Sequence, residues 1–152
     1  MTATPAEQQV QIVLIDDDEV DVEAVARLLR KHRLPSDLVT FSNGSDAKNA
    51  LAGSFGQDLA RHPYLILLDL NMPRMNGIEL LDWLREQPNL SRSIVFAFTT
   101  SEAQQDCRAA YDRQVAGYLV KSHLGSGYAA LARILNTYTQ SVLFPPHIVA
   151  TN

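Results

Sequence analysis

The chain of 152 residues has one cysteine, no surplus of basic residues and no long apolar run, and each absence excludes a class of protein. Cys107 has no partner for an internal disulfide, which excludes a secreted disulfide scaffold and favours a reducing, cytoplasmic location. The 13 basic and 17 acidic residues give a net charge of -4 without a basic stripe, so a direct nucleic-acid partner is not expected. Apolar runs such as Tyr64–Leu68 are too short to span a membrane, and no basic-then-apolar leader opens the chain, so neither a membrane span nor export is expected.

The sequence alternates short apolar runs with stretches of helical periodicity. Apolar residues make up 46% of the chain, which is enough for one compact domain with a substantial core. Five runs have the length and composition of buried strands: residues 11–15, 38–42, 64–68, 93–98 and 117–120. This alternation is typical of an α/β fold in which helices cover both faces of a parallel sheet.

Three stretches have apolar residues at the spacing of a helix face, and a fourth is introduced by a cap. The spaced residues are Val22, Val25, Ala26 and Leu29; Ala103, Cys107, Ala110 and Tyr111; and Leu131, Ile134, Leu135 and Tyr138. Ser101 and Gln104 have the spacing of a capping box, which predicts that Cys107 points inward. Asn76 and Glu79 similarly introduce a helix that Pro88 ends. Residues 53–62 are interpreted as a glycine-containing connector.

Polar residues follow four of the expected strands at their carboxyl ends. Asp16 and Asp17 follow the first strand, Asp69 the third, Thr99 the fourth and Lys121 the fifth. Because open α/β sheets gather such ends at one edge, the side chains are expected to converge. Three carboxylates close together are unfavourable unless a cation joins them, and Mg²⁺ prefers oxygen ligands. An acidic pair alone is explained by helix capping, but capping does not explain the whole set.

The motifs around these residues resemble the receiver domain of bacterial response regulators. They are Val13-Leu-Ile-Asp-Asp-Asp18, Leu67-Leu-Asp-Leu-Asn-Met-Pro73 through Gly77, Thr99-Thr-Ser101 and Gly117-Tyr-Leu-Val-Lys121. The resemblance covers residues 10–143 and implies a flavodoxin-like (βα)5 fold, with five parallel strands and five helices. Residues 1–9 are then a flexible N-terminus and residues 144–152 a tail that stabilises a dimer.

The resemblance also implies a role for each residue of the set. Asp69 is the expected acceptor of a phosphoryl group from a sensor histidine kinase, since carboxylates act as nucleophiles in aspartyl-phosphate chemistry. The resemblance implies a Mg²⁺ site formed by Asp16, Asp17, Asp69 and the Asn71 backbone carbonyl. The residues that it implies for binding the phosphoryl group or for the switch are Thr99, Thr100, Lys121 and Tyr118. The chain would then be a phosphoacceptor signalling protein and not an enzyme with external turnover.

The chain differs from the common receiver pattern in two respects, which are the residue after Lys121 and the segments before Asp69 and after the last helix. Ser122 stands where receivers commonly have a proline in a cis peptide, so a trans Lys121–Ser122 bond is expected.

The longer connector before Asp69, and a tail with no output domain after it, resemble single-domain regulators paired with phytochrome-type histidine kinases. Such a regulator is expected to form a homodimer through residues 102–113, 117–120 and 128–143. Phe144, beside two prolines, is an expected exposed anchor for the dimer, with a disordered end as the alternative.

Two other functions remain open from the residues alone. One is a receiver-fold scaffold that signals without phosphorylation. The other is a Mg²⁺-dependent phosphohydrolase, although Asn71 stands where such enzymes place a second acid. A flavin or dinucleotide binder is weaker still, because the first strand runs into three aspartates and not into a glycine-rich loop.

Overall fold

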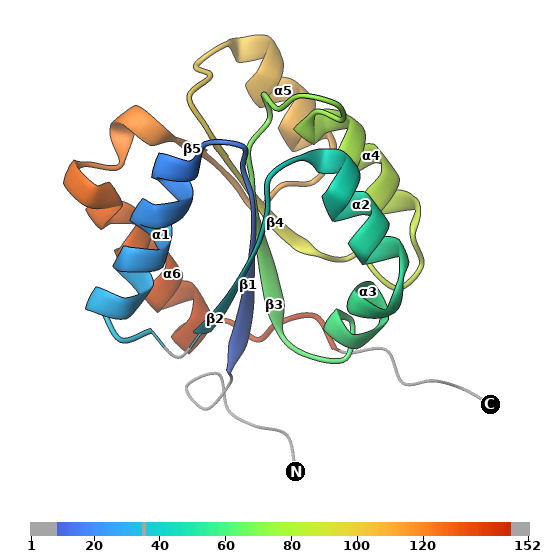
Figure 1. Cartoon of the computed structure of the whole chain (residues 1–152), viewed down its shortest axis with the longest axis horizontal. Helices are drawn as coiled ribbons and strands as arrows, with labels where there is room; N and C mark the ends of the chain where they lie inside the picture. The colour runs from blue at the N-terminus through green and yellow to red at the C-terminus, as the bar shows by residue number, and fades with distance from the viewer. Residues whose placement is uncertain (1–8, 35, 147–152) are drawn as a thin grey trace.

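Five parallel strands form the centre of the protein, as predicted. The computed structural model describes residues 9–34 and 36–146, and Figure 1 shows the sheet with helices on both sides. The strands are β1 (Val10–Ile15), β2 (Ser36–Phe41), β3 (Tyr64–Leu68), β4 (Ile94–Thr99) and β5 (Gly117–Val120). Their order in the sheet is β2-β1-β3-β4-β5, with every neighbouring pair parallel. This is the flavodoxin-like order, so the expected fold class is confirmed.

Within the described residues six α-helices, and not the five expected, connect and cover these strands. They are α1 (Glu19–Lys31), α2 (Gly44–Ala52), α3 (Ser54–Leu59), α4 (Gly77–Glu86), α5 (Gln104–Asp112) and α6 (Ala129–Ser141), with 3-10 turns η2 (Lys121–His123) and η3 (Ser126–Tyr128). In Figure 1, α1 and α6 cover one face of the sheet and α2 to α5 cover the other. The additional helix is α3, which lies in the stretch expected to be a connector. Six residues are too few to display a helical period in the sequence.

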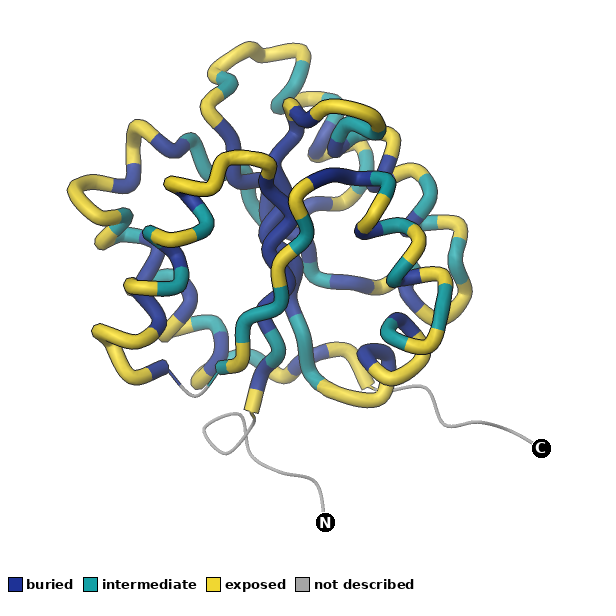
Figure 2. The backbone as a smooth tube through the Cα atoms, in the orientation of Figure 1, coloured by how far each residue is buried: buried dark blue, intermediate teal, exposed yellow. Residues whose placement is uncertain are grey.

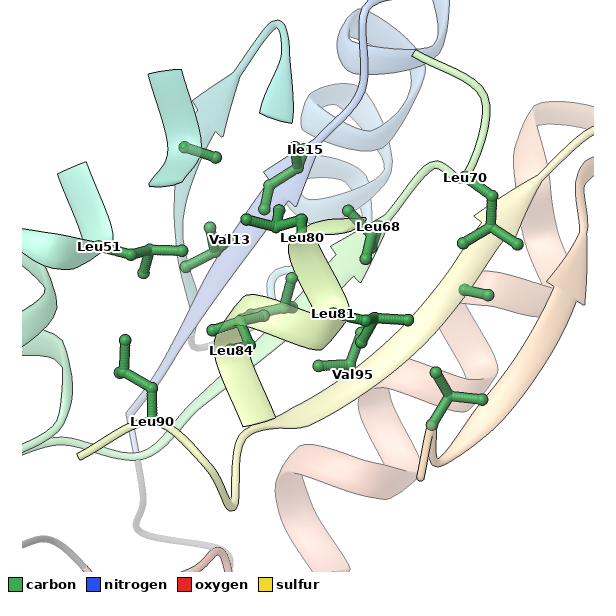
Figure 3. Packing of buried hydrophobic residues seen from close by; sticks show 14 of the residues in the cluster. Val13, Ile15, Leu51, Leu68, Leu70, Leu80, Leu81, Leu84, Leu90 and Val95 are labelled. Carbon is green, nitrogen blue, oxygen red and sulfur yellow. The ribbon is translucent and has the colours of Figure 1, made fainter. Parts of the chain in front are cut away.

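Alternating strand residues supply two cores, one on each face of the sheet. On β1, Val13 and Ile15 belong to one core and Ile12 and Leu14 to the other, as the two-residue period of a strand requires. Figure 2 shows the buried strands at the centre of the molecule. Figure 3 shows the first core, in which α4 packs its leucines against the sheet. Each fully buried leucine contributes on the order of 1.5–3 kcal/mol to folding.

The predicted helix faces are correct for α1, α4 and α6 and wrong in part for α5. Asn76 caps α4, since its side chain accepts a hydrogen bond from the Glu79 amide at 2.9 Å. No side chain caps α5, however, because the helix begins after Ala103 and Ser101 lies two residues before that N-cap. The Ser101 hydroxyl accepts from the Ala103 amide and donates to Asp106. Tyr111, expected on the inner face of α5, is 51% exposed, and Cys107 is only half buried.

The described part of the tail packs against the domain. Phe144 is buried, and its ring meets the Tyr138 ring edge to face at 5.9 Å between centroids. The expectation of an exposed aromatic anchor is therefore wrong, because Phe144 finds its partner within its own chain. Most of the expected flexible N-terminus, residues 1–8, and the end of the expected tail, residues 147–152, lie outside the described residues. What was expected of them stays a prediction. Among the described residues, no helix is both long enough and apolar enough to cross a membrane.

Candidate functional site

The acidic residues at the ends of β1 and β3 converge, as predicted. Oxygen atoms of Asp16, Asp17 and Asp69 all lie within 4.8 Å of one another. Asp16 and Asp69 are buried whereas Asp17 is exposed, so the cluster is open to solvent on one side only. The parallel register explains the convergence, because Ile15 and Leu68 are paired and each is followed directly by its aspartate. Three hard oxygen donors in this arrangement suit a divalent cation.

Lys121 places a positive charge beside these carboxylates. Its Nζ atom lies 2.8 Å from Asp16 Oδ2, 2.6 Å from Asp21 Oδ2 and 3.8 Å from Asp69 Oδ2. The ammonium also lies 4.9 Å from the centroid of the Phe98 ring. Two of its hydrogens are donated to Asp16 and Asp21, while Asp69 is beyond hydrogen-bonding distance.

Two residues of this network, Asp21 and Tyr128, are not among the site residues predicted from the sequence. Asp21 binds Lys121, and its other oxygen accepts a hydrogen bond from the Tyr128 hydroxyl at 2.5 Å. A signal for Asp21 was present, since it precedes Val25 and Leu28 by four and seven residues and therefore lies on the buried face of α1. A carboxylate on a core face requires a partner. No comparable signal identifies Tyr128.

Burial sets the charge state of the site. Desolvation raises the pKa of Asp16 to about 6, against the opposing effect of the Lys121 hydrogen bond. Burial likewise raises the pKa of Asp69, with Lys121 opposing. For Asp21 the hydrogen bonds from Lys121 and Tyr128 outweigh burial, so its pKa is lowered. The pKa of Lys121 is raised, because hydrogen bonds to Asp16 and Asp21 outweigh its burial. The lysine is therefore a permanent cation among carboxylates that it does not fully neutralise.

The loops after β1 and β3 shape the entrance to the site. Asp18 caps α1 by accepting a hydrogen bond from the Val20 amide at 2.9 Å, so this third aspartate has the capping role and is not one of the clustered carboxylates. After β3, the Asn71 amide donates to Asp69 Oδ1 at 3.3 Å. The same loop folds back on itself, and a Cβ atom on Gly77 would lie 2.5 Å from the Asp69 carbonyl oxygen. A glycine there allows α4 to begin directly against the site.

Thr99 and Tyr118 are connected through Ser101. Thr99 is completely buried beside the Asp69 carboxylate, and it opposes the rise in the pKa of that group. The Ser101 amide donates to Thr99 Oγ1 at 3.3 Å, and the Tyr118 hydroxyl donates to the Ser101 carbonyl oxygen at 3.0 Å. Thr100 lies between them and is exposed. Two hydrogen bonds therefore connect Thr99 to Tyr118 through the backbone of Ser101.

The loop after Lys121 differs from the pattern with a cis proline. The Lys121–Ser122 peptide is trans, as expected from the serine. Lys121 and Ser122 begin the turn η2, which directs the backbone away from the sheet. On its outer side, the Ser122 hydroxyl and the His123 ring both lie close to Glu102, at 3.3 Å and 3.1 Å.

The sequence from residue 12 to residue 133 matches the response regulator receiver domain. The chain belongs to this family. The matched segment contains each site residue described above. Response regulator Rcp1 of Synechocystis sp. is 33% identical over 111 residues, which cover 73% of this chain and 76% of Rcp1.

Two solved structures of response regulators are similar to this chain in fold. The phosphorylated cyanobacterial phytochrome response regulator RcpA superposes with a TM-score of 0.73 at 28% identity, covering 89% of this chain and 97% of that one. The Mn²⁺-bound form of Rcp1 gives a TM-score of 0.71 at 27% identity, covering 89% and 98%. The chain is therefore a signalling receiver similar to phytochrome response regulators.

Proposed function

We propose that Asp69 accepts a phosphoryl group from a sensor histidine kinase and that the receiver then changes a protein-binding or dimerisation surface. The observation that carries this proposal is the convergence of Asp69, the Lys121 ammonium and the buried Thr99 hydroxyl at one edge of the sheet. A nucleophile, a cation and a hydroxyl donor are the groups that transfer of a phosphoryl group requires.

The acidic cluster fits a magnesium ion. In this proposal Asp17, Asp69 and the Asn71 backbone carbonyl would hold the metal, and Asp16 would support the site from beside them. The donor set supports the assignment, because it consists of carboxylate oxygens within 4.8 Å of one another and contains neither sulfur nor imidazole. Bound Mg²⁺ supplies positive charge for the phosphoryl oxygens. A Mn²⁺-bound structure of Rcp1 supports the same conclusion by similarity.

In the transfer step, an oxygen of Asp69 forms a bond to phosphorus while the bond between phosphorus and the kinase histidine breaks. The bonding electrons return to the imidazole ring. Attack by a carboxylate on an anionic group is repulsive, so fixed positive charge and hydrogen-bond donors must stabilise the transition state. Lys121 pairs with one phosphoryl oxygen, and the Thr99 hydroxyl and the Thr100 amide donate to others.

The switch follows from the hydrogen bonds around Ser101. When Thr99 moves toward the phosphoryl group, Ser101 and Tyr118 lose their present arrangement, and the surface formed by α5, β5 and α6 changes between two populations. We assign a homodimer to this surface, where Tyr111 is an exposed aromatic residue.

Labelling with a small phosphodonor such as acetyl phosphate tests the central step. With Mg²⁺, intact mass should show one added phosphoryl group on the wild type and on the control Asp58→Asn, whose aspartate is exposed on α3. Asp69→Asn should remain unlabelled, and a chelator should abolish labelling of the wild type. Equal labelling of Asp69→Asn and the wild type would refute the proposal.

The kinase is proposed to be of the phytochrome type, because RcpA is a phytochrome response regulator and superposes on most of this chain. Phosphotransfer from purified kinases of several sensor classes tests this assignment. The phytochrome-type kinase should label Asp69 fastest at equal concentrations. Faster labelling by a kinase of another sensor class would contradict the pathway but not the phosphoacceptor role.

A further inference from the structure

Asp21 connects the site to the start of α6. Its Oδ2 atom accepts from Lys121 Nζ at 2.6 Å, which is shorter than the contacts of Lys121 with Asp16 and Asp69. Its Oδ1 atom accepts from the Tyr128 hydroxyl at 2.5 Å. One buried carboxylate on α1 thus bridges the ammonium of the site and a tyrosine that is 107 residues away in the sequence. A bridge of two charge-assisted hydrogen bonds in a buried place has defined geometry.

Tyr128 is the residue at which η3 ends and α6 begins. Its backbone is left-handed, with φ 58° and ψ 41°, a conformation that costs a tyrosine on the order of 1 kcal/mol or more. Its ring packs edge to face on Phe98 with 5.2 Å between centroids, and the Lys121 Nζ atom lies 4.9 Å from the centroid of the same Phe98 ring. The conformation at the start of α6 is therefore stabilised by contacts with the site itself.

A phosphoryl group on Asp69 would compete with Asp21 for the ammonium. The Lys121 Nζ atom lies 3.8 Å from Asp69 Oδ2, so phosphoryl oxygens attached there would come close to the ammonium and offer it new anionic acceptors. Asp16 and Asp69 directly follow the neighbouring strands β1 and β3, whereas Asp21 belongs to α1. An Asp21 carboxylate that no longer binds Lys121 is free to reorient, so the hydrogen bond that it accepts from Tyr128 is no longer held in place.

We propose that Asp21 is a positioning residue that couples Lys121 to Tyr128, giving the site a second route to α6 that is separate from Thr99 and Tyr118. The inference rests on the proposed function of Asp69 and adds a residue pair and a direction of transmission to it. Phosphorylation releases Asp21 from Lys121, and the start of α6 rearranges about Tyr128.

Amide hydrogen exchange on the full chain tests this coupling. Exchange is compared between the metal-free protein and the protein with Mg²⁺ and beryllofluoride, in peptides that cover residues 99–105 and 124–135. In the wild type both segments should respond. Tyr128→Phe removes the hydroxyl and keeps the ring against Phe98, so the response of residues 124–135 should be lost while that of residues 99–105 remains. Asp21→Asn should have the same effect.

Tyr138→Phe is the matched control, because Tyr138 lies on the same helix but packs against Phe96. It should keep both responses. A purely structural role of Tyr128 would raise exchange equally in the two states and leave their difference unchanged, which would overturn the inference. Failure of the inference is distinguishable from failure of the proposed function, because phosphodonor labelling of Asp69 reports on the latter alone.

Discussion

Replacing Asp16 by asparagine tests the electrostatics of the site most sharply. Asp16 is almost fully buried, and burial raises its pKa from 3.8 to about 6 although Lys121 lies 2.8 Å away. The folded protein therefore binds a proton more tightly than the unfolded chain at this position. Asparagine has nearly the same shape but does not titrate, so the substitution removes this contribution to the pH dependence of stability.

The magnitude follows from the two pKa values. Between pH 3.8 and about pH 6 the folded state carries more protons than the unfolded state, so the free energy of unfolding falls as the pH rises through this interval. The loss is complete above the folded pKa and amounts to about 3 kcal/mol. For a chain of this length that corresponds to roughly 6–12 °C in Tm. Asparagine keeps only one of the two acceptor oxygens with which Asp16 binds Lys121 and the Asp18 amide, and the loss of one hydrogen bond adds an offset that does not vary across the interval.

The assay is urea unfolding in the presence of a chelator, at about pH 4 and at about pH 7.5. Because pH 4 lies just above the unfolded pKa, Asp16→Asn should gain about 2.5 kcal/mol over the wild type on going from the lower to the higher pH. Asp112→Asn, a substitution of an exposed aspartate at the end of α5, should run parallel to the wild type. Parallel curves for Asp16→Asn and the wild type would refute the reasoning.

Three further substitutions or measurements address the same site and the proposed dimer. Lys121→Met leaves buried carboxylates without their cation, so the free energy of unfolding, measured with urea at neutral pH, should fall by about 3–5 kcal/mol. The control Lys31→Met, at the exposed end of α1, should change it by less than about 0.5 kcal/mol. Asp17→Asn removes one charge from the carboxylate cluster, so the metal-free Tm should not fall, while the rise in Tm on adding Mg²⁺ should disappear. An unaltered rise would exclude Asp17 as a ligand. Light scattering at micromolar concentration should give the mass of a dimer for the wild type and of a monomer for Tyr111→Glu, and a monomeric wild type with and without beryllofluoride would argue against the dimer.

The parallel sheet and the acidic cluster could be predicted because they depend on local signals. Each strand is a short apolar run, and each polar residue follows its strand directly, so the topology alone brings Asp16, Asp17 and Asp69 together. The same reasoning located Lys121 and Thr99. No knowledge of side-chain packing was needed for these residues, only the rule that parallel strands end at a common edge.

The features that were missed depend on contacts between distant segments. Ser101 has the sequence signature of a cap, but α5 begins after Ala103, which lies two residues later. The Ser101 hydroxyl binds Ala103 and Asp106, and its carbonyl oxygen accepts from Tyr118. The pair of Asp21 and Tyr128 forms only when α1 and η3 pack together, and no spacing in the sequence records that contact. Phe144 was expected to be exposed because its neighbours are prolines, yet it packs on Tyr138.

A crystal structure with Mg²⁺ and beryllofluoride is the most direct test of the claim that these residues form one phosphoryl site. The account predicts beryllofluoride bonded to an Asp69 oxygen, with Lys121 and Thr99 on its fluorine atoms and the metal on Asp17, Asp69 and the Asn71 carbonyl. An Asp69 carboxylate left unmodified at saturating beryllofluoride, or a metal bound elsewhere in the chain, would contradict it.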